Sequence, residues 1–182
     1  PRTRNTPISD GAGQYRAIGR MLAINSFKEV RDGLEAAVQT LNKVETNSEL
    51  NELNTKVTGQ YQDATKETPL VFVISSMAGG TGASMAFDVC RLLSSIDGVQ
   101  SGKTAVFMFT PEVFEAVNAD KMTGTRGNAL AMFGEAFAAQ AGTAVEHDQR
   151  LLQAMGISGH SDTATFNRLF PIGARALSLI HI

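Results

Sequence analysis

The sequence predicts an α/β fold with three layers and a mostly parallel sheet. Two short apolar runs, residues 70–74 and 105–109, have the composition of buried strands. The first is rich in β-branched residues, and we expect it to be buried on both faces. A mostly apolar helical pattern lies between them and ends near Asp97 and Gly98. Strand, helix and strand in this order form a βαβ unit, in which the strands are parallel and the crossover is right-handed.

The composition is typical of one globular domain. The chain has 182 residues, of which 43% are hydrophobic and 19% are charged, enough to bury a sizeable core. The net charge of −2 gives no electrostatic reason to expect binding to nucleic acid or to an acidic membrane. The single cysteine, Cys90, excludes an intrachain disulfide and favours the cytoplasm. No apolar run reaches the ~20 residues that span a bilayer.

Helical patterns dominate the chain before the first strand. From residue 14 to about residue 43, apolar residues recur mostly at steps of three and four, which predicts an amphipathic helix interrupted near Asn25 and Ser26. Residues 44–69 are mostly polar, with a few apolar residues at helical spacing. We interpret them as a polar insertion that forms a solvent-facing helical hairpin or excursion and ends at Pro69.

The chain after the second strand continues with helices. Residues 128–140 and 143–155 each predict one. Residues 169–172 have the composition of a further strand, although Pro171 counts against it because proline cannot donate to a sheet.

A loop of small and hydroxyl-bearing residues follows the first strand. Residues 75–84 have the sequence SSMAGGTGAS, without a charged side chain, so the backbone is the part that can bind a ligand. Ligands of parallel sheets bind beyond the carboxyl ends of the strands, and glycines let backbone amides approach closely. The next helix begins around Ser84, and its positive end favours an anion. We expect a phosphate here, bonded also by the Thr81 and Ser84 hydroxyls; the alternative is a tight turn whose glycines only pack.

Three other loop motifs fit these residues less well. A Walker loop would end in Gly-Lys-Ser/Thr, and no lysine lies between Leu70 and Gly102. A Rossmann fingerprint would need a third glycine where Met85 stands. A nucleophile elbow around Ser76 would need a small residue where Ile74 stands.

Another glycine turn, residues 11–14 with the sequence GAGQ, lies earlier in the chain and opens the first helix. We call it the first glycine loop, and residues 75–84 the second. By itself the first loop is a weak indication of a ligand, but two such loops in one small domain reinforce each other. If Gly80 and Gly82 bring amides against a phosphate, we expect Gly82→Val to remove phosphate binding while the fold survives.

The two glycine segments together resemble the tubulin/FtsZ superfamily. GAGQYRAIGR, residues 11–20, is similar to its bacterial pattern GAGxxxxxGR, and LVFVISSMAGGTGASMA, residues 70–86, is similar to its signature loop GGGTG[ST]G at the end of a hydrophobic strand. The resemblance covers residues 10–43 and 69–110 and is to divergent bacterial tubulin-like proteins. It implies a tubulin/FtsZ-type, Rossmann-like nucleotide-binding domain over residues 1–176.

The resemblance also implies a site for GTP or GDP, with Mg²⁺ accompanying GTP. In the family the signature loop wraps the α- and β-phosphates, a role that falls here on Ala78, Gly79, Gly80, Thr81, Gly82, Ala83 and Ser84. The first loop senses the γ-phosphate, a role that falls on Gly11, Ala12, Gly13 and Gln14. The loop beside the ribose corresponds to Thr110, Pro111 and Glu112, with Glu115 as a further contact. The amide of Asn128 suits a base or a ribose, although its place at the start of a predicted helix favours an N-cap.

The chain also departs from the family. Ala78 and Ser84 stand where the signature has glycines. We interpret the chain as a fragment: it begins at Pro1, and the family's opening strand, its earliest glycine loop and its acidic NxDxxD loop are missing. In the family the acidic loop activates the attacking water, so we expect no GTP hydrolysis by this chain alone and assign no catalytic residue and no metal ligand. Residues 177–182, without a cap or polar tail, are interpreted as foreign to the domain.

The resemblance implies that the intact protein is a self-assembling, bacterial cytoplasmic GTPase, a homo-oligomer or filament. A second hypothesis is a nucleotide-binding or scaffold protein that does not polymerise. A third is a dinucleotide-dependent oxidoreductase, which predicts an acidic residue about 20 residues past the glycine loop, at the end of the second strand. Asp97 has about that spacing but lies before the strand, which counts against the third hypothesis.

Overall fold

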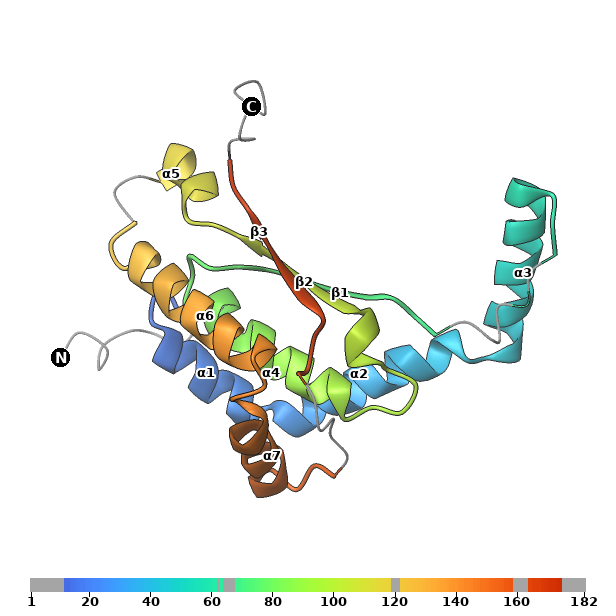
Figure 1. Cartoon of the computed structure of the whole chain (residues 1–182), viewed down its shortest axis with the longest axis horizontal. Coiled ribbons are helices and arrows are strands. Elements are labelled where there is room, and N and C mark those ends of the chain that lie inside the picture. Colours follow the sequence, from blue (N-terminus) through green and yellow to red (C-terminus); the bar gives the residue numbers. More distant parts are fainter. Residues whose placement is uncertain (1–11, 62, 64–67, 119–121, 159–163, 175–182) are drawn as a thin grey trace.

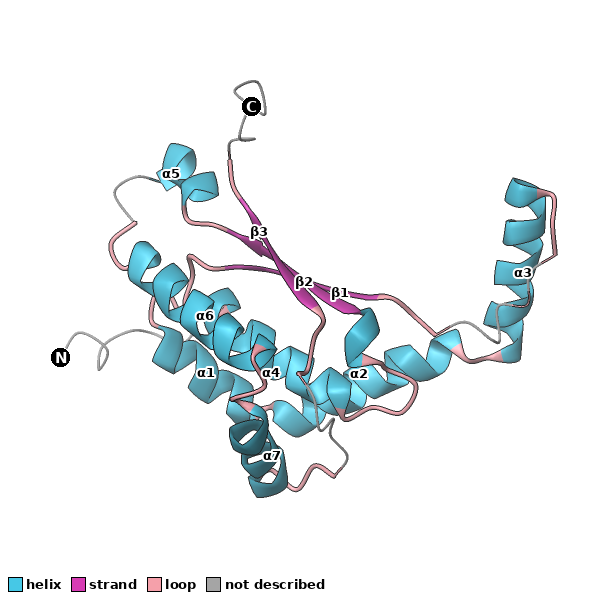
Figure 2. Ribbon diagram, in the orientation of Figure 1, coloured by secondary structure: helices cyan, strands magenta, loops and turns pink. Residues whose placement is uncertain are grey.

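The computed structural model describes residues 12–61, 63, 68–118, 122–158 and 164–174. Figures 1 and 2 show a sheet with helices gathered beneath it. The elements are α1 (Arg16–Asn25), α2 (Phe27–Leu41), α3 (Val44–Thr58), β1 (Val71–Ser76), α4 (Gly82–Ser94), a 3-10 turn (Ser101–Lys103), β2 (Thr104–Phe109), α5 (Glu112–Asn118), α6 (Thr125–Gln140), α7 (Val145–Ala154) and β3 (Arg168–Ile172).

The three strands form one parallel sheet in the order β1-β2-β3. Helix α4 connects β1 to β2, as the βαβ pattern predicts, and the α/β fold with a parallel sheet is confirmed. Strand β3 forms despite Pro171, which pairs with Met108 of β2. Proline is tolerated there because β3 is an edge strand of the described sheet and needs to donate hydrogen bonds on one side only.

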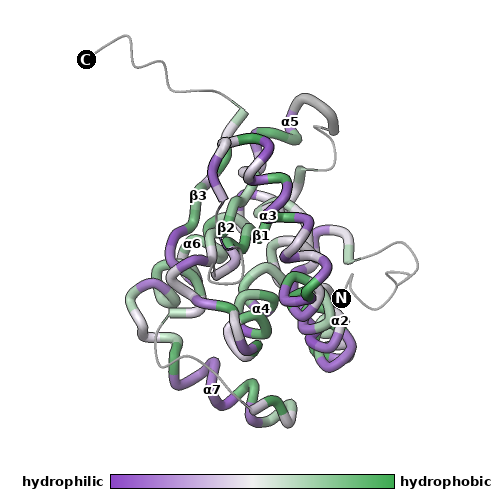
Figure 3. The backbone as a smooth tube through the Cα atoms, turned by 90° about the vertical axis from the view of Figure 1, so that its right-hand side faces the viewer, coloured by the Kyte–Doolittle hydropathy of each residue, from purple (hydrophilic) through white to green (hydrophobic). Residues whose placement is uncertain are grey.

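Helices α1, α2, α4, α6 and α7 lie on one side of the sheet (Figure 1). The main core fills the space between the sheet and α4 and α6, and its largest side chains include Met77, Phe87, Met108, Met132 and Phe166. In Figure 3 the strands are coloured mainly as hydrophobic, at the centre of the molecule. This packing explains why the α4 sequence is apolar over most of its length.

The opposite face of the sheet carries exposed apolar side chains. Phe72 is 58% exposed and Ile74 is 65% exposed, while Val73 between them packs against the core. Across the strands, the Phe107 ring lies 5.6 Å from that of Phe72 and 5.0 Å from that of Phe170. The expectation that the first strand is buried on both faces is therefore wrong for the described residues, since helices cover only the other face.

The helical pattern before the first strand divides as predicted. Helix α1 ends at Asn25, and α2 starts at Phe27 after Ser26. Helix α3 projects away from the sheet (Figure 1) and has no buried residue. It ends at Thr58 and is followed by the C-cap residue Gly59, which has a φ of 71°. The exposure of α3 agrees with a polar, solvent-facing excursion.

Candidate functional site

The two glycine loops lie side by side at the carboxyl end of the sheet. Strand β1 ends at Ser76 and α4 begins at Gly82, so the second loop occupies the position where parallel sheets bind ligands. The Gly80 N–H donates a hydrogen bond of 2.7 Å to the carbonyl oxygen of Gly13. Residues 12–14 thus contact a loop that lies far away in the sequence; Gly11 is outside the described residues.

Two glycines are required by this contact between the loops. A Cβ on Gly80 would lie 2.8 Å from the Tyr15 nitrogen and 2.9 Å from the Ala12 carbonyl oxygen. A Cβ on Gly19, in α1, would lie 2.5 Å from the Gly80 carbonyl oxygen. The obstacles around Gly80 are backbone atoms, and those around Gly19 are backbone atoms of Gly80 and the Ser84 hydroxyl, so both glycines let the two segments pack closely.

Gly82 packs against the end of the strand. A Cβ there would lie 2.7 Å from the Ser75 hydroxyl and 2.9 Å from the Ser76 carbonyl oxygen. The expectation that valine at this position leaves folding intact is therefore wrong. Gly79 differs, because an added Cβ would have only the Gly13 carbonyl oxygen within 4 Å, at 3.9 Å.

Three amides in the loop of residues 75–84 remain without an acceptor among the described residues: those of Gly79, Thr81 and Gly82. Their neighbours are engaged, since the Ala78 N–H donates to the Ser76 hydroxyl at 3.0 Å and the Ala83 N–H donates to the Gly79 carbonyl at 3.2 Å. The three amides precede or begin α4, whose positive end adds to their attraction for an anion. This part of the loop can therefore bind a negatively charged group.

The two candidate hydroxyls differ in their surroundings. The buried Ser84 hydroxyl donates to the Thr81 carbonyl oxygen at 3.0 Å, so it already stabilises the first turn of α4. The Thr81 side chain is exposed, and its hydroxyl has no partner within the described part of the chain. Thr81 is thus the freer of the two hydroxyls to bond a ligand.

Asn128 joins the two loops from a third element. Its side-chain Nδ2 donates to the Gln14 carbonyl oxygen at 3.0 Å and to the Ala78 carbonyl oxygen at 2.9 Å. The N-cap interpretation of Asn128 is wrong, because α6 begins at Thr125 and its N-cap is Gly124. The sequence offers no signal for this bridge, since it depends on how α6 packs against the loops.

A pocket of about 450 Å³ opens between the end of β2, α5 and α6. It is lined by Thr110, Pro111, Glu112, Glu115, Arg126, Ala129, Leu130 and Phe133. The lining includes every predicted ribose or base contact except Asn128. The Arg126 guanidinium pairs with the Glu115 carboxylate at 3.2 Å, a partner that the sequence reasoning missed.

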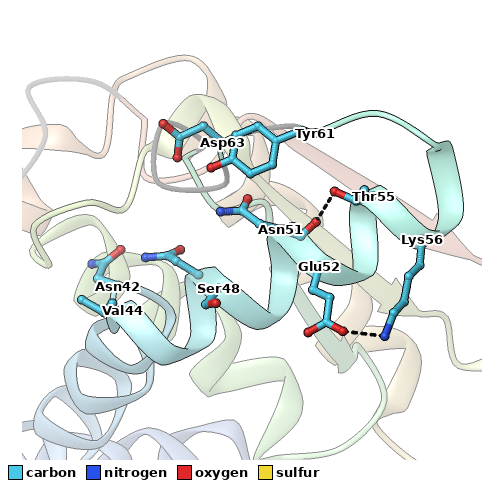
Figure 4. A pocket seen from close by; sticks show the side chains of 10 residues that line it. Asn42, Val44, Ser48, Asn51, Glu52, Thr55, Lys56, Tyr61 and Asp63 are labelled. Carbon is cyan, nitrogen blue, oxygen red and sulfur yellow. Dashed lines mark hydrogen bonds and ion pairs between the residues drawn. The ribbon is translucent and has the colours of Figure 1, made fainter.

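A larger pocket, of about 870 Å³, lies along α3 and the segment at Tyr61 and Asp63. Figure 4 shows polar side chains of α3 facing it, including the Glu52–Lys56 pair, whose charged atoms lie 2.6 Å apart. No described residue of either glycine loop lines this pocket. Its described lining consists mostly of polar side chains of α3.

A mostly buried ionic network joins α1, α4 and α7. Arg91 of α4 donates to the Asp148 carboxylate of α7 at 2.6 Å and also pairs with Asp88. Arg20 of α1 reaches the same Asp88 at 3.4 Å. Burial raises the pKa of the Asp88 carboxyl, although Arg91 and Arg20 oppose the rise. The network ties the helices that follow both glycine loops to α7, and the sequence reasoning did not find it.

No metal centre or reactive thiol stands out among the described residues. No group of three or more possible ligands is found in that part of the chain. Cys90 is buried in the core, and burial raises its pKa to about 12, so its thiol is inert. Likewise, none of the described helices is long and apolar enough to cross a membrane.

Comparison with known proteins gives one match. The model of a family described as "Tubulin like" matches residues 1–179. No curated protein and no solved structure matches the chain.

Proposed function

Because the chain belongs to the tubulin-like family, we propose that its two glycine loops bind the phosphates of a guanine nucleotide, GTP or GDP. The observation that carries the proposal is the joined pair of loops at the carboxyl end of a parallel sheet, with the amides of Gly79, Thr81 and Gly82 lacking an acceptor among the described residues. A phosphate would satisfy these amides with charge-assisted hydrogen bonds.

Residues 78–84 of the second loop then hold the α- and β-phosphates at the start of α4. The first loop, residues 11–14, lies beside a terminal phosphate, and Mg²⁺ accompanies GTP there. Support for a shared role comes from the Gly80–Gly13 hydrogen bond and from the bridge through Asn128. Both tie the loops together, so that one ligand can contact the two.

The pocket at the end of β2 is our candidate for the nucleoside. Its volume of about 450 Å³ falls in the range of small-molecule sites. The carboxylates of Glu112 and Glu115 can accept hydrogen bonds from ribose hydroxyls, and Phe133 offers an aromatic face to a base. Thr110 and Pro111 complete the wall on the β2 side.

We further propose that the intact protein is a bacterial, cytoplasmic protein that assembles with copies of itself. Support comes from the family membership and from the bacterial form of the GAGxxxxxGR segment. In this proposal hydrolysis takes place where subunits meet, with an acidic loop supplied by the neighbouring subunit.

Calorimetry with GTP, GDP, ATP and NAD tests the nucleotide proposal. We expect GTP and GDP to bind the protein more tightly than ATP or NAD. Tight binding of NAD with no heat from GTP would contradict the proposal and favour a dinucleotide enzyme.

A further inference from the structure

Asn128 is the described side chain that donates to both glycine loops at once. The Nδ2 atom has two hydrogens, and one goes to the Gln14 carbonyl while the other goes to the Ala78 carbonyl, at 3.0 and 2.9 Å. Gln14 follows Gly13, whose carbonyl oxygen accepts from the Gly80 amide. The loops are therefore tied at two neighbouring points, one by backbone and one by the Asn128 side chain.

We propose that Asn128 is a positioning residue that holds the two glycine loops in the arrangement that binds phosphate. The inference rests on the proposed nucleotide function and gives Asn128 a role outside the nucleoside pocket, whose lining does not include it. The Gly80–Gly13 hydrogen bond and the close backbone packing join the loops on one side, and the two hydrogen bonds of Asn128 add a second tie that restricts rotation about the first. Holding a site in its bound geometry lowers the entropy that binding must overcome.

The fold does not depend on Asn128 in the same way. Arg16 of α1 pairs with Glu135 of α6 at 2.6 Å and donates from Nε to the Ala83 carbonyl of α4 at 2.8 Å. These contacts, together with the core residues Ala129, Met132 and Ala136, keep α6 docked when the amide of Asn128 is removed. A loss of loop order can therefore be separated from a loss of folding.

Two variants and a matched control test the role in the full chain. Asn128→Ala removes both donors, and Asn128→Asp keeps the shape but places a carboxylate against two carbonyl oxygens. Gln140→Ala is the control, because Gln140 lies on the same helix and its amide also donates to a backbone carbonyl, that of Asn167, at 3.3 Å. The measurements are GTP affinity by calorimetry, thermal unfolding, and amide hydrogen exchange of residues 12–15 and 77–81.

We expect Asn128→Ala to unfold close to the wild-type temperature, to exchange faster in both loops, and to bind GTP about tenfold more weakly, the loss that corresponds to one or two hydrogen bonds. Asn128→Asp should bind more weakly still near pH 8. Relative to wild type at the same pH, it should recover as the pH falls to about 5, because a protonated carboxyl can again donate to one carbonyl. The deficit of Asn128→Ala should stay constant over this range, and Gln140→Ala should match wild type throughout.

Three outcomes would overturn the role. Unchanged exchange in both loops of Asn128→Ala would show that the amide does not hold them, and unchanged GTP affinity despite faster exchange would show that its hold does not serve binding. An Asn128→Asp deficit independent of pH would remove the hydrogen-bond explanation. If wild type binds no GTP, the nucleotide proposal itself has failed, and the exchange data still decide whether Asn128 holds the loops.

Discussion

At the scale of single residues, the glycines of the signature loop have separate duties that the motif alone does not distinguish. Gly80 and Gly82 are surrounded by backbone atoms of the first loop and of β1, respectively, whereas Gly79 has open space where a Cβ would stand. A substitution at Gly79 therefore reports on a ligand, and a substitution at Gly82 reports on the fold.

We expect Gly79→Val to keep the wild-type melting temperature and to weaken GTP binding by about 1.5–3 kcal/mol, the value of one charge-assisted hydrogen bond. Gly82→Val should lower the free energy of unfolding by about 2–3 kcal/mol, because the side chain collides with Ser76. Calorimetry and thermal unfolding of both variants check the pair. Wild-type GTP affinity in a folded Gly79→Val protein would argue against phosphate at this position.

Asp88 should impose a distinct pH dependence on stability. Burial raises the pKa of the Asp88 carboxyl above its usual value of 3.8. At pH values between the unfolded pKa and the higher native pKa, the native state therefore keeps a proton that the unfolded chain has released. The unfolded state then binds fewer protons, and stability falls as the pH rises through this range.

The test compares wild type with Asp88→Asn by urea unfolding at several pH values between about 4 and 7. The difference in unfolding free energy, wild type minus variant, should decrease with rising pH. A difference that increases instead would mean that Arg91 and Arg20 lower the pKa of Asp88 below its unfolded value.

At the scale of elements, the two faces of β1 have unequal importance for stability. Val73 packs between the sheet and the helices, while its neighbour Ile74 is 65% exposed on the other face. Val73→Thr should cost about 1–2 kcal/mol, because it buries a hydroxyl among apolar groups.

Ile74→Thr is the matched control for the opposite face, and it should change the unfolding free energy by no more than about 0.5 kcal/mol. Chemical denaturation of the two variants measures both values. Equal losses would mean that something covers the outer face of β1 in solution.

The elements were largely predictable because their signals are local. The apolar runs before Ser75 and after Lys103 mark the two strands, and the break at Ser26 separates α1 from α2. Which side of β1 is covered was not predictable, because an apolar run has the same composition whether one face or both are packed. The sequence also could not decide whether residues 169–172 form a strand. Proline is tolerated in an edge strand, and only the structure shows that β3 lies at the edge of the described sheet.

At the scale of the whole molecule, the candidate site is assembled from three regions of the chain. The positions of both glycine loops followed from their sequence patterns, because each lies directly before a helix. The hydrogen bond between Gly80 and Gly13, the bridge through Asn128 and the pairing of Arg126 with Glu115 did not follow. Those contacts depend on how α1, α4 and α6 pack, and no local pattern encodes the packing.

In the proposed site the N–H groups of Gly79, Thr81 and Gly82 donate hydrogen bonds to a nucleotide phosphate. The most direct test is to measure backbone amide chemical shifts by NMR during a GTP titration. We expect these three amides to show the largest downfield shifts, since each gains a charged acceptor, while the amide of Gly59, the residue that follows α3, stays unchanged. The contradicting result is saturation with GTP while the three loop amides keep their positions and the shifts gather instead around the α3 pocket, at Ser48 and Thr55.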